Sequence, residues 1–128
     1  MKLYNAIKNK AGQFISAIAN RTRGVRGVEV QTLIHDAIAG KGLIAIDYKG
    51  DGIRYIEPHA IGATKAGNIV LRAYQRSGAS RTDGANGAWR LFTVAEITKA
   101  RGTWRRFDVR DGYKRDDRAM QGGISAQL

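Results

Sequence analysis

Arginines on short apolar segments are the residues of this sequence best suited to chemistry with an anion. The planar guanidinium grips a phosphate through two parallel hydrogen bonds, so several arginines that converge on one patch form an anion site. Alternate residues of a strand share a face, which predicts that Arg72 and Tyr74 point together and that Arg90 points away from Leu91. The alternative is that a strand arginine covers only its own solvent face.

Aromatic residues accompany these arginines and are candidates for stacking on bases: Tyr55, Tyr74 and Trp89. Such stacking contributes roughly 1–3 kcal/mol per base in proteins that bind single strands. An aromatic side chain in a small β-domain is about as often part of the core. Both roles therefore stay open for each ring.

Further cations lie in a long polar loop and near the last predicted strand. Arg76 and Arg81 stand among serine and glycine, which predicts a contact with backbone phosphates, with a disordered loop as the alternative. The second basic set is diluted by aspartates, so part of it is expected to be paired internally. This set consists of Arg101, Arg105, Arg106, Arg110, Lys114, Arg115 and Arg118.

The charge of the chain favours a polyanionic partner. Twenty-two Lys and Arg residues against 11 Asp and Glu residues give a net charge of +11, which attracts polyanions and repels a second copy. Nucleic acid is the expected partner, with an anionic membrane surface or a merely solubilising charge as alternatives. No apolar run reaches the roughly 18–20 residues that span a bilayer, and the absence of cysteine fits a cytoplasmic location.

Signals for catalysis are weak. Without cysteine there is neither a thiol nucleophile nor a thiolate zinc site. His35 has no partner histidine at metal spacing. Gly40-Lys41-Gly42 precedes a strand, whereas a phosphate loop opens a helix. We therefore expect a binding protein with no enzymatic activity, no metal and no cofactor.

Periodicity predicts helices first and strands afterwards. Apolar residues three to four positions apart predict helices over 3–19 and from Val30 to Gly40. Short apolar runs separated by turns then predict strands at 43–48, 53–57, 59–63, 69–74, 89–94 and 103–109. Pro58 is expected to mark the end or the edge of its strand, and Trp104 and Phe107 are expected to supply core.

The chain thus divides into three expected parts. Residues 1–40 form a basic helical segment, residues 41–109 a β-domain, and residues 110–128 a charged, glycine-containing tail that is expected to fray.

Three segments of the β-domain resemble the WYL-domain family. Residues 53–62 are similar to the segment in which an arginine, a Val-Glu-Pro-like corner and an aromatic lead into the next strand. Residues 67–74 resemble the strand that names the family, and residues 89–97 resemble its Arg-x-Phe-plus-Ile ending. There are departures: Ile69 and Val70 replace the Trp-Tyr of the name, His59 replaces a frequent tyrosine, and Thr93 and Glu96 replace basic residues of many members.

The resemblance implies a mainly β (α+β) fold, a small five-stranded antiparallel Sm-like barrel, here preceded by two helices. It implies binding of nucleic acid or a nucleotide-like ligand in the regulation of transcription or defence. It also places five cationic or titratable side chains near one barrel face: Arg54, His59, Lys65, Arg72 and Arg90. Short stand-alone relatives resemble those of bacteriophages, so we expect a phage source.

Three hypotheses follow. The first is a nucleic-acid-binding protein that grips single-stranded or duplex DNA or RNA with its strand arginines. The second is a nucleotide sensor or sponge that modulates host defence. The third is assembly into homo-oligomers, or onto a partner, through the apolar stripe of the helix predicted at 3–19.

Overall fold

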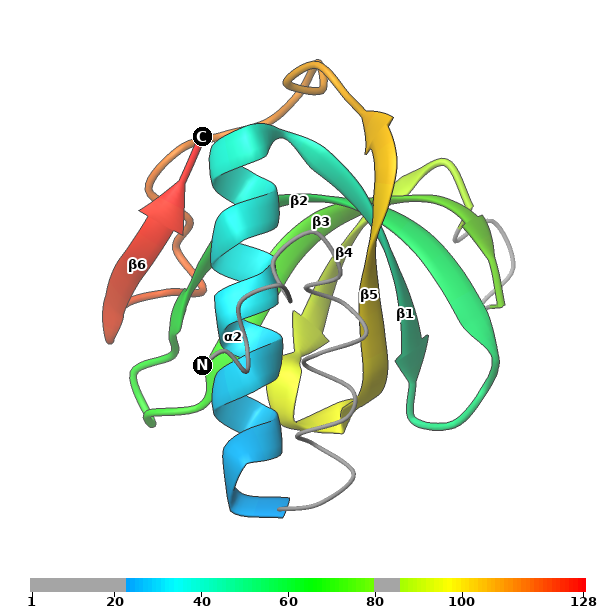
Figure 1. Ribbon diagram of the computed structural model, residues 1–128. Helices are drawn as coiled ribbons and strands as arrows, with labels where there is room; N and C mark the ends of the chain where they lie inside the picture. The colour runs from blue at the N-terminus through cyan, green and yellow to red at the C-terminus, as the bar shows by residue number, and fades with distance from the viewer. Residues whose placement is uncertain (1–22, 80–85) are drawn as a thin grey trace.

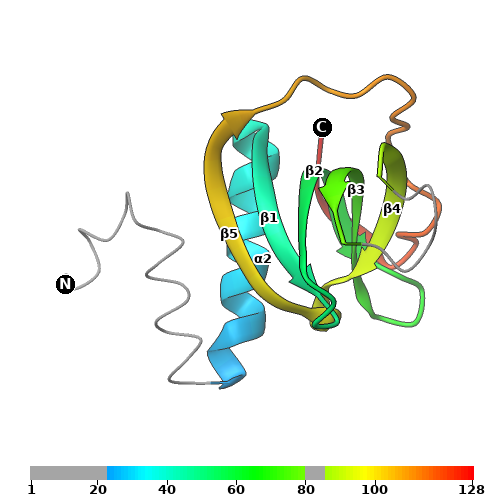
Figure 2. The ribbon, with the colours of Figure 1, turned by 90° about the vertical axis from the view of Figure 1, so that its right-hand side faces the viewer.

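A computed structural model describes residues 23–79 and 86–128, which form one helix and six strands (Figure 1). In chain order the elements are α2 (Arg23–Gly40), β1 (Gly42–Tyr48), β2 (Ile53–Ala63), β3 (Ile69–Gly78), β4 (Ala88–Thr93), the 3₁₀ turn η1 (Val94–Glu96), β5 (Ile97–Arg106) and β6 (Gly123–Gln127). All strand pairs are antiparallel. Figure 2 shows a strongly bent sheet beside α2.

The strands follow the order β4-β3-β2-β1-β5, and β6 joins at β2. One edge of the long strand β2 pairs with β3 along most of its length. Its other edge is shared, since residues 53–56 pair with β1 and residues 60–63 pair with β6. The sheet therefore branches at β2.

The apolar face of the sheet packs against α2. Ile34 is fully buried and Ile38 nearly so, and both belong to one core cluster with Ile46 and Phe92 of the sheet. The helix predicted from Val30 to Gly40 is confirmed as part of α2, which begins earlier, at Arg23. The helix predicted over 3–19 lies outside the described residues.

The predicted five-stranded barrel preceded by two helices is wrong. The described residues contain one helix, and their six strands form an open sheet, because no ladder joins the terminal strands β4 and β5. The turn η1 connects these strands instead. Since α2 covers the apolar face, the sheet buries its core without closing on itself.

Pro58 does not end a strand but lies inside β2. It is buried and sits between the stretch of β2 that pairs with β1 and the stretch that pairs with β6. A register shift follows at residues 58–60 in the ladder with β3. A proline has no N–H to donate to a ladder. Pro58 needs none on this edge of β2, because it lies between the residues that pair with β1 and those that pair with β6.

The tail, residues 110–128, is ordered rather than frayed. Its end forms β6, and Gly122 N donates to Ala63 O at 2.8 Å. Met120 forms a second small core with Ala60 and Val70, on the opposite face of the sheet from α2. The tail thus covers the outer face of β2 and β3. No helix in residues 23–79 and 86–128 is both long and apolar enough to cross a membrane.

Candidate functional site

The strand register separates the predicted arginines onto two faces of the sheet. Partners in a ladder share a face. Arg54 pairs with the buried Ile46, and Arg90 pairs with the buried Ala73, so both arginines lie on the core side. Arg72 lies on the opposite side, beneath the tail. The expectation that these arginines share one face is therefore wrong. The ladder partner of Arg72 is Leu91, and successive residues of one strand point to opposite faces, so Arg90 points away from Arg72.

Arg54 is part of the interior. Its side chain is 1% exposed, its Nη1 donates to Gln75 Oε1 at 3.2 Å, and its Nη2 lies 3.7 Å from an Asp51 carboxylate oxygen. Its guanidinium also lies over the rings of Tyr48 and Phe92, at 5.2 and 5.7 Å from the centroids. These contacts make Arg54 a structural cation.

Arg90 also lies near the Phe92 ring, as Arg54 does. Its guanidinium is 5.8 Å from the Phe92 centroid. Its Nη1 is buried and has no hydrogen-bond partner among the described residues, although the side chain as a whole is half-buried. Arg90 therefore remains a candidate for an anion contact, but it is separated from Arg72 by the sheet.

Arg72 is held by a carboxylate of the tail. Its Nε and Nη2 donate to the two oxygens of Asp117, at 2.6 and 3.3 Å. The hydrogen bond from Arg72 is the main cause that lowers the pKa of Asp117, which is thus a carboxylate at neutral pH. The carboxylate of Asp117 therefore occupies the position on the Arg72 guanidinium at which a phosphate would bind.

A buried carboxylate holds two further arginines. Glu57 is fully buried on β2 and accepts from Arg76 Nε at 3.0 Å and from Arg110 Nη2 at 2.7 Å. Arg110 also lies over the ring of Tyr74, 4.1 Å from its centroid. Part of the second basic set is therefore paired internally, as predicted, and Arg76 and Tyr74 take part in the same network.

His59 is also interior. It is fully buried, and its ring centroid lies 4.7 Å from that of Trp89 and 4.9 Å from that of Tyr113. Its Nε2 accepts from Arg110 N at 3.0 Å, so the proton of the neutral ring is on Nδ1, which donates to Glu57 O at 2.9 Å. Burial lowers the pKa of His59. This histidine positions the start of the tail and contacts no solvent.

Lys65 and Arg81 were also predicted as binding residues, and neither belongs to the contacts described above. Lys65 is exposed in the turn between β2 and β3. Arg81 lies outside the described residues.

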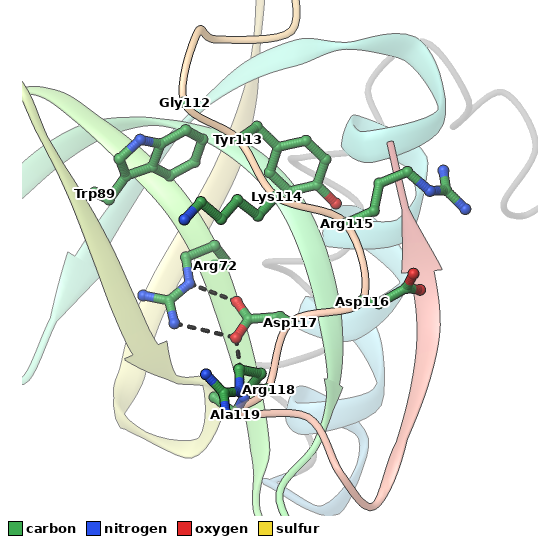
Figure 3. A pocket seen from close by; sticks show the side chains of 10 residues that line it. All are labelled: Arg72, Trp89, Gly112, Tyr113, Lys114, Arg115, Asp116, Asp117, Arg118 and Ala119. Atoms are coloured by element: carbon green, nitrogen blue, oxygen red, sulfur yellow. Dashed lines mark hydrogen bonds and ion pairs between the residues drawn. The ribbon is translucent and has the colours of Figure 1, made fainter.

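The tail and the outer face of β3 and β4 line a partly open pocket of about 520 Å³, which we call the tail pocket (Figure 3). It is lined by Arg72, Trp89, Gly112, Tyr113, Lys114, Arg115, Asp116, Asp117, Arg118 and Ala119. Figure 3 shows Lys114 extending towards Trp89 and Arg72, whereas Arg115 and Asp116 point away from them towards β6. The Trp89 and Tyr113 rings lie 5.9 Å apart and 30° from parallel.

The charges of the tail pocket favour an anion. Arg72 and Asp117 neutralise each other. Arg115 and Asp116 point away towards β6, where Asp116 accepts a hydrogen bond from Gln127 Nε2 at 3.1 Å, so Lys114 and Arg118 are the cations that remain in the lining. Among the described residues, no group of three or more His, Cys, Asp or Glu side chains could hold a metal ion. The tail pocket therefore offers aromatic rings for stacking next to ammonium and guanidinium groups that can contact an anion.

The sequence pattern did not bring this lining together. Arg72 was a candidate site residue and Trp89 a candidate ring, the three tail cations belonged to the second basic set, and Tyr113 was not singled out. The mixture of cations and aspartates in 110–118 was the available signal, because buried arginines need carboxylate partners. The pattern could not show that this segment folds back over β3.

Comparisons with known proteins support the fold. No protein-family model matches the chain, and no curated protein matches it. Among solved structures, the chain is similar to part of Proteasome accessory factor B/C (PafBC) of Arthrobacter aurescens, with a TM-score of 0.55 and 19% sequence identity. The likeness covers 67% of this chain and 13% of PafBC, so the chain spans a small part of that protein's length.

Proposed function

We propose that this protein is a WYL-like regulatory protein that binds nucleic acid, without enzymatic activity, and that the tail pocket is its binding site. The observation that carries the proposal is the position of Lys114, whose side chain extends towards Trp89 and Arg72 in a pocket that Tyr113 also lines. An aromatic ring offers a platform to a base, and the ammonium group offers a contact to its phosphate. The net charge of +11 supports attraction of such a polyanion.

The proposed site differs from the one expected from the strand arginines. Arg54, Arg72 and Arg76 are each held by a side-chain carboxylate or amide of the protein itself. In the proposed site the phosphate contacts come from the tail, through Lys114 and Arg118, and Arg72 holds the tail in place through Asp117.

A small nucleotide is the second candidate ligand. The tail pocket, at about 520 Å³, has the size of a small-molecule site, and its rings and cations suit a base with one or two phosphates. A thermal-shift panel of linear and cyclic nucleotides tests this candidate. Stabilisation that grows with ligand concentration would favour it.

Fluorescence anisotropy with labelled DNA and RNA oligonucleotides over a salt series tests the main proposal. Affinity should fall steeply with salt, because each neutralised phosphate releases counterions. In the double variant Lys114→Gln, Arg118→Gln we expect roughly tenfold weaker binding and a salt slope reduced by about 1–2.

The matched control is Lys49→Gln, which removes an exposed cation in the β1–β2 turn, away from the tail pocket. Its affinity should stay within about twofold of the unaltered protein. If the unaltered protein binds no oligonucleotide at low salt, or if the double variant binds like the control, the tail pocket is not a nucleic-acid site.

A further inference from the structure

Among residues 23–79 and 86–128, Trp104 is the most exposed of the large apolar side chains. It lies on β5, at the end of the strand order, and is 90% exposed, although the sequence predicts it in the core. Phe107, only three positions further, is buried as predicted. An indole in water gains no burial energy, so the fold gives no reason for a tryptophan at this position.

A β-bulge directs Trp104 outward. In the ladder between β1 and β5, Gly42 pairs with Arg106 and Ile44 pairs with Gly102, so three residues of β5 stand opposite Leu43 alone. Thr103 fixes this bulge, because its Oγ1 donates to Leu43 O at 2.6 Å and accepts from Arg105 N at 3.2 Å. Bulges commonly re-aim a side chain in this way. The outward position of Trp104 is therefore a defined feature of the strand.

Exposed cations accompany Trp104 along β5. Lys99, Arg101, Arg105 and Arg106 all lie on β5 and are exposed, and β5 itself contains no acidic residue. The nearest carboxylates in the chain are Glu96 before the strand and Asp108 after it, and Asp47 faces Lys99 across the ladder. Arg106 is partly committed, since its Nη1 donates to Gly40 O at 2.8 Å. Arg101 and Arg105 have no ion-pair or hydrogen-bond partner for their side chains among the described residues.

We propose that this edge, Trp104 with Arg101 and Arg105, is a second contact surface and that it takes single-stranded nucleic acid. A base stacks on the indole while the two arginines contact the flanking phosphates. The inference rests on the proposed function but uses none of the residues of the tail pocket. It assigns to β5 a preference for unpaired bases.

The chemistry of the edge selects this ligand over others. A second copy of the chain would bring the same cations against one another. A duplex hides the faces of its bases within the stack, so it offers phosphates to the arginines but nothing to the indole. An unpaired base and its phosphates match both kinds of group at once.

The test uses Trp104→Ala and Trp104→Phe in the full chain, with Ile53→Ala as the matched control. Ile53 is 43% exposed and lies on β2, so its replacement also removes exposed apolar surface. Anisotropy is measured with a labelled oligo-dT strand and with a blunt-ended duplex of two strands. Because the indole is exposed, Trp104→Ala should melt at the same temperature as the unaltered protein.

For Trp104→Ala we expect affinity for oligo-dT to fall roughly 5- to 100-fold and affinity for the duplex to change less than about twofold. Trp104→Phe should keep most of the affinity, and Ile53→Ala should keep all of it. If the unaltered protein binds neither oligonucleotide, the proposed function itself fails. If it binds oligo-dT and Trp104→Ala binds equally well, only the present inference is overturned.

Vesicles of phosphatidylserine and phosphatidylcholine complete the experiment, since a tryptophan among arginines also suits an anionic membrane. No vesicle binding, together with the loss of oligo-dT affinity, is the expected result. Vesicle binding that Trp104→Ala abolishes, with unchanged affinity for oligo-dT, would assign the edge to a membrane surface and overturn the proposal.

Discussion

The guanidinium of Arg72 on β3 donates two hydrogen bonds to the carboxylate of Asp117 in the tail, at 2.6 and 3.3 Å. The two residues are 45 positions apart in the chain. This geometry is the one in which an arginine grips a phosphate. Arg72 therefore fastens the tail over the outer face of the sheet, and so shapes the pocket that the tail lines.

Asp117→Asn should lower the free energy of unfolding by about 1–2 kcal/mol, because it removes a charge-assisted pair whose carboxylate is only 11% exposed. The pKa of Asp117 is lowered in the folded state. The pair thus stabilises the fold above the unfolded pKa of about 3.9, and this stability is lost as the pH falls through the folded pKa. Urea denaturation at several pH values measures both effects.

The control for this variant is Asp108→Asn, which changes an exposed carboxylate outside the pair. Its unfolding energy should stay within about 0.5 kcal/mol of the unaltered protein. Equal effects of the two substitutions would show that the Arg72–Asp117 pair does not hold the tail.

Protonation of His59 should destabilise the protein in mildly acidic solution. Burial lowers its pKa in the folded state, so the unfolded chain takes up the proton first as the pH falls. Stability is complete above the unfolded pKa of about 6.5 and decreases as the pH falls from there towards the folded pKa. Urea midpoints between pH 5 and 7.5 measure this slope.

Nitrogen NMR of the imidazole gives an independent check. We expect a neutral ring protonated on Nδ1, because Nε2 accepts from Arg110 N. A His59 that titrates at or above the ordinary pKa of histidine would contradict the buried position.

Glu57→Gln should be among the more damaging polar substitutions. It removes the charge that holds Arg76 and Arg110, and leaves both guanidinium groups beside a buried neutral amide. We expect a loss of about 2–3 kcal/mol in the free energy of unfolding, measured by urea denaturation. Glu96→Gln, at an exposed position in η1, is the matched control and should cost less than about 0.5 kcal/mol.

Gly78→Ala should disturb the end of β3. Gly78 has a φ of 111°, and a methyl group there would overlap Ile53 O and Arg54 Cα. Strain and overlap together predict a loss of about 2–4 kcal/mol. Gly67 has a similar φ of 94° but open space around it, so Gly67→Ala should cost only about 1–2 kcal/mol. Thermal unfolding of the pair separates the effect of overlap from that of φ.

Local patterns predicted the elements well where neighbours in the chain decide the outcome. The helical spacing up to Gly40 and the strands predicted between residues 43 and 94 were correct within a few residues, and so was the alternation that directs Arg72 and Tyr74 away from Leu71. The strand predicted at 103–109 was misplaced, since β5 runs from Ile97 to Arg106, and β6 was missed because its partner β2 is distant in sequence. Pro58 was misplaced because its tolerance depends on two strands, β1 and β6, that are distant in sequence. Trp104 was misplaced because a bulge, which no periodicity shows, turns it outward.

The sequence predicts cations and aromatic rings as the groups of a binding site, but not which of them the fold brings together. The strand arginines that were expected to share one face lie on two faces of the sheet. The partners of each arginine depend on contacts between distant segments, such as Arg76 and Arg110 with Glu57. No pattern along the chain reveals which guanidinium a buried carboxylate will hold.

The sequence by itself determined the positive charge, the helix that ends at Gly40 and the strands from β1 to β4, because charge and apolar periodicity are properties of neighbouring residues. Only the tertiary structure decided that the sheet stays open, that the tail folds over its outer face, and that Arg72 meets Asp117. These features depend on the burial of groups far apart in the chain, and burial is fixed only when all the elements have packed together.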